Sequence, residues 1–317
     1  MNILITGADG FIGRGLVTRI LASETLPLTL DRRARLILLD QKFGSVCSDA
    51  RVEHIEGDIA APKTLERALA SEVQYVFHLA SLPGGAAEAH FEDGLKVNFQ
   101  ATATLFELLR GQRIRPTVVF ASSVGVYGVP LPETIDEKTA AEPTLSYGAH
   151  KLVGEILLLD YSRRGYIDGR SVRLPGIVAR PPHPSGLLSA FMSEVIVKLS
   201  AGLHFTCPVS ADGMSWWMSR PCALENLLHA ATLDPSVVRK RRSYLLPVLH
   251  ASIADVVAAI ADIHGPEVTG RITFNPDAQV QAQFANLPPL HCPESLAAGF
   301  RHDGTLERLV QRALEGH

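Results

Sequence analysis

The chain has 317 residues, 46% of them hydrophobic, and carries a net charge of −3 with a pI near 6.5. This length suits one large domain or two smaller ones that share an interface, and the charge argues against a nucleic-acid or anionic-membrane partner. No stretch approaches the ~20 apolar residues that span a bilayer, and the apolar start is a glycine-containing strand rather than a secretion signal. We therefore expect a cytoplasmic protein that acts on a small molecule.

Cysteines and histidines show no pattern typical of metal binding. The four cysteines are far apart and lack C-x-x-C pairing, and the twelve histidines lack any H-E-x-x-H spacing. We expect reduced thiols and no metal site.

The first predicted elements are a strand over residues 3–6, a turn, and a helix over residues 11–21. The turn reads G-x-x-G-x-x-G, formed by Gly7, Gly10 and Gly13. Gly10 lets the backbone approach a pyrophosphate, Gly13 lets the helix pack close to the strand, and the helix N-terminus attracts the anion. The motif predicts a dinucleotide site, although an ordinary strand-to-helix turn has similar composition.

An acid closes the second predicted strand. Residues 35–39 are mostly apolar and Asp40 follows them. A carboxylate at this place accepts the hydroxyls of an adenosine ribose and repels a 2′-phosphate. Because no arginine immediately follows Asp40, the pattern favours NAD over NADP; capping of the next segment is the alternative role for Asp40.

Strands and helices then alternate up to residue 174, which is typical of a parallel, doubly wound sheet. Prolines crowd residues 175–184, and shorter elements follow. We expect an α/β fold: a Rossmann-type doubly wound parallel sheet with a smaller α+β substrate lobe. The predicted NAD domain covers residues 1–174 with a returning segment near 215–235, and the lobe covers 175–214 and 236–317. Further predicted strands are 51–56, 74–79, 117–120 and 169–174, and further helices are 62–69, 88–110, 147–164, 222–232 and 253–263.

Two features predict the chemistry. Ser122 and Ser123 follow a strand, at the sheet edge where ligands bind. Tyr147 and Lys151 are four residues apart on a predicted helix and so share a face. A phenol with a pKa of ~10 is a poor base at neutral pH, and a nearby ammonium favours its phenolate. Tyr147 is then the candidate general base, with a serine hydroxyl polarising the same substrate oxygen.

These motifs together resemble the extended short-chain dehydrogenase/reductase family, in its NAD-dependent epimerase/dehydratase branch, over essentially the whole chain. The residues that carry the resemblance are Thr6-Gly7-x-x-Gly10-x-x-Gly13, Asp58-Ile59, His78-Leu79-Ala80, Asn98, Ser122-Ser123 through Tyr127-Gly128, and Tyr147 with Lys151.

The resemblance implies roles for individual residues. Ser123 corresponds to the catalytic serine, because it precedes Gly128 by five positions, and it acts with Tyr147 and Lys151. The implied cofactor is NAD. Its implied contacts are Gly7, Gly10, Phe11, Ile12 and Gly13 at the pyrophosphate, Asp40 at the ribose, Asp58 and Ile59 at the adenine, Leu79, Ala80, Ser81 and Asn98 along the cofactor, Ser122, Tyr147 and Lys151 at the reacting end, and Pro175 and Ile177 at the nicotinamide.

Segments 160–175 and 217–231 resemble, more narrowly, NAD-linked dehydrogenases of small sugar acids. That resemblance implies oxidation of a 2-hydroxyl, with D-erythronate as the first choice of substrate. Arg180 is the candidate for its carboxylate, since a guanidinium binds carboxylates in bidentate fashion; bracing the proline-rich segment is its alternative role. Gly176 departs from the threonine expected in this subgroup.

Two other functions stay open. In an epimerase of nucleoside-diphosphate sugars, NAD remains bound and is regenerated in each turnover. In a silent NAD sensor no chemistry occurs, but the intact serine, tyrosine and lysine argue against this. Both Arg180 and Arg220 are available to an anionic substrate, so counting arginines does not decide between dehydrogenase and epimerase.

The helices at 88–110 and 147–164 carry apolar stripes, such as Leu152, Ile156 and Leu159. In the family these helices pair across a two-fold axis, so the resemblance implies a homodimer. In the alternative, both stripes face the protein's own sheet.

Overall fold

The computed structural model describes residues 1–22, 28, 34–181 and 188–315. The chain forms two compact units. Unit 1 comprises residues 1–129, 140–173 and 227–244, and unit 2 comprises 130–139, 174–226 and 245–317. The segment that returns to the nucleotide-binding part is thus 227–244 in the structure, against the predicted 215–235.

Unit 1 is built on a seven-stranded sheet with the order β11-β7-β5-β4-β1-β2-β3. Neighbours β1–β2, β1–β4, β2–β3 and β4–β5 all pair in parallel. The chain leaves β1 toward one edge of the sheet and then returns to place β4 on the other side of β1. This reversal defines a crevice at the carboxyl ends of β1 and β4, where ligands bind in doubly wound sheets. The predicted fold class is confirmed. The strands are β1 (Asn2–Thr6), β2 (Arg35–Asp40), β3 (Val52–Glu56), β4 (Tyr75–His78), β5 (Thr117–Ser123), β7 (Asp168–Leu174) and β11 (Ser243–Leu245).

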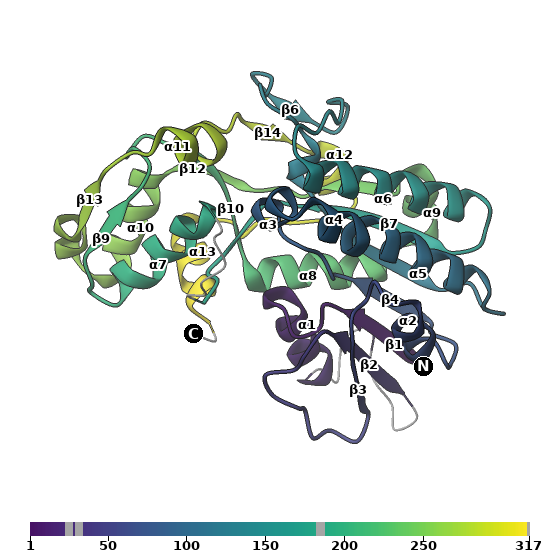
Figure 1. The fold of residues 1–317 in the computed structure, drawn as a ribbon. Coiled ribbons are helices and arrows are strands. Elements are labelled where there is room, and N and C mark those ends of the chain that lie inside the picture. The colour runs from purple at the N-terminus through teal and green to yellow at the C-terminus, as the bar shows by residue number, and fades with distance from the viewer. Residues whose placement is uncertain (23–27, 29–33, 182–187, 316–317) are drawn as a thin grey trace. The chain divides into compact units, whose positions relative to one another are not determined.

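Helices cover both faces of this sheet (Figure 1). Helices α2 (Pro62–Ala68), α5 (Ala101–Arg110) and α6 (Ser146–Arg163) pack side by side over one face, and α1 (Phe11–Ala22) covers the other. The apolar residues of the strands are buried on both faces, as a parallel sheet requires. Val76, Phe106, Phe120 and Leu158 lie in the core beneath α2, α5 and α6. The short helices η2 (Val124–Val126) and α9 (Pro235–Lys240) complete unit 1.

The single helix predicted over residues 88–110 is instead four consecutive segments. They are α3 (Gly84–Ala89), α4 (Phe91–Gly94), the π-helix η1 (Leu95–Gln100) and α5. His90, at φ −125° and ψ 69°, interrupts the helix between α3 and α4. The π-helical turn contains Asn98, whose side chain bonds the loop after β4. The residue period of the sequence does not reveal such a wide turn, which occurs mostly at functional sites.

Unit 2 contains three small sheets and several helices. Strands β8 (Gly176–Val178) and β12 (Leu249–Ser252) flank β10 (Met214–Ser219), in parallel and antiparallel pairing respectively. Strand β9 (Phe205–Cys207) pairs with β13 (Ile272–Phe274), and β6 (Ile135–Asp136) pairs with β14 (Leu290–His291). The helices are η3 (Leu188–Ala190), α7 (Phe191–Ser200), α10 (Ile253–His264), η4 (Pro266–Arg271), α11 (Ala278–Phe284), α12 (Pro293–Ala297) and α13 (Leu306–Leu314). Helix α8 (Arg220–Ala231) begins in unit 2 and ends in unit 1, because the division falls after residue 226.

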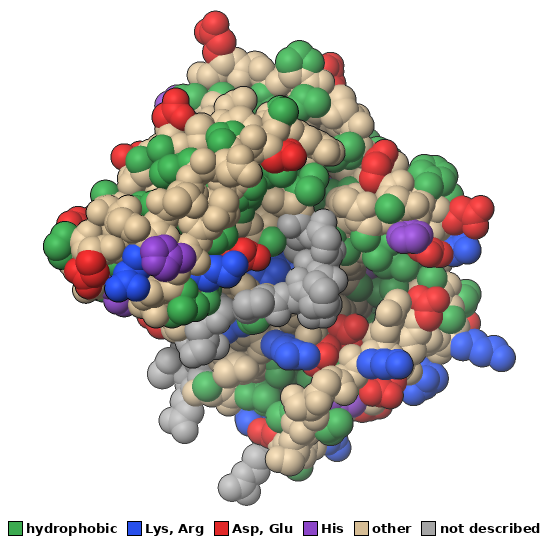
Figure 2. Space-filling view, turned by 60° about the vertical axis from the view of Figure 1, so that its left-hand side comes forward, with side chains coloured by type: hydrophobic (Ala, Val, Ile, Leu, Met, Phe, Trp, Pro, Cys, Tyr) green, Lys and Arg blue, Asp and Glu red, His purple; other side chains and the backbone are tan. Residues whose placement is uncertain are grey.

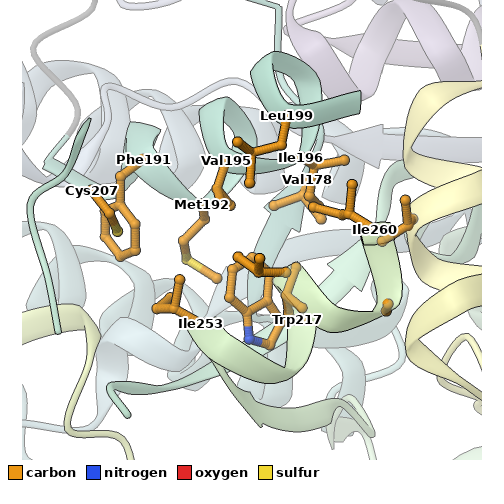
Figure 3. Packing of buried hydrophobic residues seen from close by; sticks show 14 of the residues in the cluster. Val178, Phe191, Met192, Val195, Ile196, Leu199, Cys207, Trp217, Ile253 and Ile260 are labelled. Atoms are coloured by element: carbon orange, nitrogen blue, oxygen red, sulfur yellow. The ribbon is translucent and has the colours of Figure 1, made fainter. Parts of the chain in front are cut away.

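Trp217 of β10 lies at the centre of the unit 2 core (Figure 3). Met192 and Ile196 of α7 lie within the same apolar cluster, which packs around the indole. The indole Nε1–H donates to the carbonyl oxygen of Ala251 at 3.0 Å, so its one polar group is paired although the side chain is fully buried. Unit 2 therefore has a core of its own.

Acidic and basic side chains are interspersed over the face shown in Figure 2, in keeping with the small net charge of −3. Among the described residues, no helix combines the length and apolar character that crossing a bilayer requires.

Candidate active site

The glycine turn lies at the crevice, directly after β1. Gly7 has φ +69°, which favours glycine, and a Cβ there would lie 2.7 Å from the main-chain nitrogen of Ala80. A Cβ on Gly13 would lie 2.2 Å from the Gly7 carbonyl oxygen, so α1 approaches β1 too closely for any other residue. Gly10 is exposed, and a Cβ there would meet only the Gly7 oxygen, at 3.2 Å. The backbone at Gly10 is thus open to a ligand, and the turn fits a pyrophosphate at the N-terminus of α1.

Asp40 is the last residue of β2, beside this turn. Its Oδ2 accepts a hydrogen bond from the Asp9 N–H at 2.8 Å, and its Oδ1 accepts one from the Gln41 N–H at 2.7 Å. Burial raises the pKa of the Asp40 carboxyl group. The next predicted pair differs in exposure: Asp58 is exposed, whereas Ile59 is buried in the core of unit 1.

The loop after β4 forms the other wall of the crevice. The Leu79 N–H donates to the Thr6 carbonyl at 3.1 Å, and the Ala80 N–H donates to the Thr6 hydroxyl at 3.3 Å. Asn98 holds the next residues: its Oδ1 accepts from Ser81 Oγ at 3.1 Å and from the Leu82 N–H at 2.7 Å, while its Nδ2 donates to the Leu82 carbonyl at 3.0 Å. The amide of Asn98 is therefore used to shape the loop.

A buried histidine that the sequence analysis gave no separate role lies behind this loop. Thr102 donates its one hydroxyl proton to the Asn98 carbonyl, so its oxygen can only accept a hydrogen bond from His78. The His78 Nε2–H therefore donates to Thr102 Oγ1 at 2.9 Å. The other ring nitrogen, Nδ1, accepts from Thr6 Oγ1 at 2.7 Å. Burial, and then the charge of Lys151, lower the pKa of His78 to about 3. The imidazole is neutral and links Thr6 of β1 to Thr102 of α5, whose hydroxyl in turn bonds the π-helical turn at Asn98. A histidine within an apolar strand, Tyr75-Val76-Phe77-His78, was the available signal.

Ser123 and Tyr147 are brought together around Gly125. Ser123 is the last residue of β5, and its Oγ accepts from the Gly125 N–H at 3.0 Å. A Cβ on Gly125 would lie 3.3 Å from Ser123 Oγ and 3.5 Å from Tyr147 Cδ1. Gly148 makes this possible, because a Cβ there would lie only 2.0 Å from the Gly125 carbonyl oxygen. The serine hydroxyl and the tyrosine ring therefore border the same small space.

Lys151 lies one turn further along α6. Its Nζ is 5.7 Å from the centroid of the Tyr147 ring and 5.0 Å from that of Phe120. The side chain is buried, and this desolvation lowers the pKa of Lys151 to about 7, against an opposing effect of Glu155. Tyr147 and Lys151 thus share a helix face, as the spacing predicted.

Glu155 is the second group that the sequence analysis missed. This buried carboxylate accepts hydrogen bonds from the hydroxyls of Ser122 and Ser243, the latter at 3.0 Å. Arg173 donates to both of its oxygens, with the Nη2–Oε2 distance 2.8 Å, and also donates to the Tyr127 hydroxyl at 2.9 Å. In the sequence, the position of Glu155 four residues after Lys151 was the signal that could have identified it. The hydroxyl of Ser122, which was predicted beside the cofactor, donates to this carboxylate.

The remaining predicted residues belong to unit 2. Pro175 is buried, Ile177 lies in β8, and the Arg180 N–H donates to Ser193 Oγ at 2.9 Å. At Gly176, where threonine was expected, a Cβ would lie 3.0 Å from Met192 Cε and 3.0 Å from the Trp216 carbonyl oxygen. A larger residue at position 176 would require the Met192 side chain of α7 to pack differently.

Sheet order, glycine turn and Asp40 together define unit 1 as a Rossmann-type dinucleotide-binding domain. The chain belongs to the NAD-dependent epimerase/dehydratase family, whose model matches residues 3–217. The family relationship predicted from the motifs is thereby confirmed, and with it the NAD cofactor.

Curated relatives match over almost the full length. The chain is 37% identical to a D-erythronate dehydrogenase of Cupriavidus necator, over 99% of this chain and 98% of that protein. It is 31% identical to a D-erythronate dehydrogenase of Haemophilus influenzae, over 99% of both chains. Among solved structures, a nucleoside-diphosphate-sugar epimerase from Agrobacterium tumefaciens is 30% identical with a TM-score of 0.93, covering 100% of this chain and 94% of that one.

Proposed function

We propose that this protein is an NAD-dependent dehydrogenase that oxidises D-erythronate at its 2-hydroxyl to 2-oxo-tetronate. The observation that carries the proposal is the 37% identity, over 99% of the chain, to a D-erythronate dehydrogenase. The grouping of Ser123, Tyr147 and Lys151 beside the nucleotide crevice supports it, because oxidation of a secondary alcohol needs a base at the hydroxyl.

In the proposed mechanism, the Ser123 hydroxyl donates a hydrogen bond to the substrate oxygen and orients it. The Tyr147 phenolate takes the proton of the 2-hydroxyl, and the Lys151 ammonium stabilises that phenolate. NAD, held by the glycine turn and Asp40, supplies the acceptor for the hydride that leaves C2. The products are the 2-oxo acid, NADH and the proton held on Tyr147.

A substrate screen tests the proposal. Incubation with NAD and a panel of four- to six-carbon aldonates is expected to form NADH with D-erythronate, seen by its near-ultraviolet absorbance. The similarity to a nucleoside-diphosphate-sugar epimerase makes epimerisation the second candidate. Interconversion of UDP-sugars, with no NADH formed from any aldonate, would replace the dehydrogenase with the epimerase.

We also propose that Arg180 binds the substrate carboxylate, because a guanidinium suits its bidentate geometry. The main-chain N–H of Arg180 donates to Ser193 Oγ, but this bond does not involve the guanidinium, so bracing of the proline-rich segment stays the alternative role. Arg180→Met is expected to raise KM for the aldonate with little change in kcat if the first role holds.

Asp40 is proposed to select NAD. Asp40→Ala is expected to weaken NAD binding and to narrow the gap in affinity between NAD and NADP, because the variant loses the acceptor for the ribose hydroxyls and the repulsion of a 2′-phosphate. Titration of each cofactor measures both effects. A wild-type protein that binds NADP more tightly than NAD would show this role to be wrong.

We propose a cytoplasmic homodimer. Exposed apolar side chains lie on helices that contact one another, α4 and α6: Phe91 (56% exposed), Val153 (38%), Ile156 (56%) and Leu159 (40%). Such a patch is typical of an interface, and a two-fold axis is the commonest arrangement. Light scattering is expected to give twice the chain mass of 34.3 kDa, and Ile156→Lys is expected to shift it toward monomer. A wild-type mass of one chain at micromolar concentrations excludes the dimer.

A further inference from the structure

Arg14 lies near Asp40 in the structure, although no arginine directly follows Asp40 in the sequence. Arg14 extends from the second turn of α1 back to Asp9 in the glycine turn. Its Nε donates to Asp9 Oδ1 at 2.9 Å and its Nη2 donates to Asp9 Oδ2 at 2.7 Å. The guanidinium is thus held in bidentate fashion by the residue that precedes Gly10.

The same aspartate is joined to Asp40. The Asp9 N–H donates to Asp40 Oδ2 at 2.8 Å, and Asp9 Oδ2 accepts from the Gly44 N–H at 3.1 Å. Arg14 Nη2 would lie 3.1 Å from a Cβ on Gly44, so the cation lies between the glycine turn and the loop after β2. The three side chains therefore form one charged cluster at the carboxyl end of β2.

The pKa shifts of Asp9 and Arg14 agree in direction with this contact geometry. Burial acts to raise the pKa of Asp9, but the hydrogen bonds from Arg14 and Gly44 lower it on balance. The hydrogen bond to Asp9 raises the pKa of Arg14, and the charge of Asp40 adds to this effect. Three further titratable groups lie near this cluster: Lys42 is exposed in the same loop, His54 Nε2 accepts from the Cys47 N–H at 3.2 Å, and Glu56 Oε1 accepts from the Phe43 N–H at 3.1 Å.

The Arg14–Asp9 ion pair lies on the surface, and its two hydrogen bonds are bidentate. Arg14 has 57% of its side chain exposed and Asp9 has 16%, so the pair contributes little to stability. The pair matters instead for ligand binding. A guanidinium can bind a phosphate in bidentate fashion, but that of Arg14 is already bound to the Asp9 carboxylate. In addition, with the ribose against Asp40 as proposed above, Asp9 and Asp40 would place two negative charges near a 2′-phosphate.

We propose that Asp9 is a second cofactor-specificity residue, which excludes NADP by occupying Arg14 as well as by its own charge. Arg14 is then a cation ready to bind a 2′-phosphate once Asp9 no longer holds it. This inference uses the role of Asp40 at the ribose that we proposed above, and it is independent of the sugar-acid substrate.

A set of four proteins tests the proposal by binding alone. Wild type, Asp9→Asn, Arg14→Gln and the double variant are titrated with NADH and NADPH, with nucleotide fluorescence as the readout. Asp9→Asn keeps the shape of the side chain and removes its charge. It is expected to lower the ratio of the NADPH to the NADH dissociation constant by about tenfold or more, the value of one charge-assisted hydrogen bond.

The arginine variants separate the two parts of the effect. Arg14→Gln alone is expected to leave the ratio unchanged or raised, and Arg14→Gln added to Asp9→Asn is expected to abolish most of the gain. An unchanged ratio in Asp9→Asn overturns the proposal, and a gain that persists in the double variant overturns the role of Arg14. Asp9→Ser provides the same test should Asp9→Asn fold poorly. If Asp40→Ala leaves NADH affinity unaltered, the ribose assignment itself fails, whatever the Asp9 variants show.

Discussion

Tyr147→Phe is expected to lower kcat by ~10² or more while NAD affinity stays nearly unchanged. The variant removes only the phenol oxygen, the proposed acceptor of the substrate proton. The ring, which borders the space beside Ser123 Oγ, remains to pack as before. Turnover of D-erythronate and titration with NAD measure the two quantities separately.

Ser123→Ala is the companion variant. Ser123 Oγ already accepts the Gly125 N–H at 3.0 Å, so its own proton is available to the substrate oxygen. We expect a fall in kcat with NAD binding retained, because one polarising hydrogen bond is lost and the base remains. A Tyr147→Phe protein that keeps half of the wild-type activity would show that another group takes the proton.

Lys151 adds a pH dependence to this result. Burial lowers the pKa of the Lys151 ammonium to about 7, so in the free protein its charge is lost as pH rises through that value. Loss of the charge weakens the stabilisation of the Tyr147 phenolate. This loss is expected to act against kcat/KM as pH rises past about 7. A pH profile of kcat/KM for the wild type, which reports the groups of the free enzyme, measures this effect.

Those parts of the site formed by consecutive residues were predictable from the sequence. Gly7, Gly10 and Gly13 belong to one turn, and Asp40 ends one strand, so local spacing and general rules for doubly wound sheets were enough. Tyr147 and Lys151 are similar, since they are related by one helical turn.

The residues that were missed are those whose partners lie far along the chain. Glu155 binds Ser122, which lies 33 residues earlier, and Ser243, which lies 88 residues later. Periodicity and local motifs contain no information on such contacts. They also do not show the break of the helix at His90.

Glu155 gives the largest expected effect on stability. Glu155→Ala is expected to lower the free energy of unfolding by about 3–5 kcal/mol, the usual result of removing one partner from a buried ion pair. The variant leaves the guanidinium of Arg173, whose side chain is 13% exposed, without its carboxylate. It also removes the acceptor of the Ser122 and Ser243 hydroxyls.

Urea unfolding of this variant and of a matched control distinguishes the loss of a buried ion pair from the loss of an exposed one. Glu194 pairs with Lys198 at 2.9 Å on α7, but both side chains are more than a third exposed. Glu194→Ala is therefore expected to change the free energy of unfolding by less than about 1 kcal/mol. Equal effects of the two substitutions would contradict the importance of the buried pair.

The same carboxylate connects stability to catalysis through two of its neighbours. Ser122 precedes Ser123 on β5, and Lys151 lies one turn before Glu155 on α6, so Glu155 holds both elements that carry the proposed catalytic residues. Its charge also acts to raise the pKa of Lys151. Glu155→Gln, which keeps the shape and removes the charge, is thus expected to move loss of the Lys151 ammonium to lower pH. A kcat/KM profile whose high-pH side stays in place would show that Glu155 acts on the fold alone.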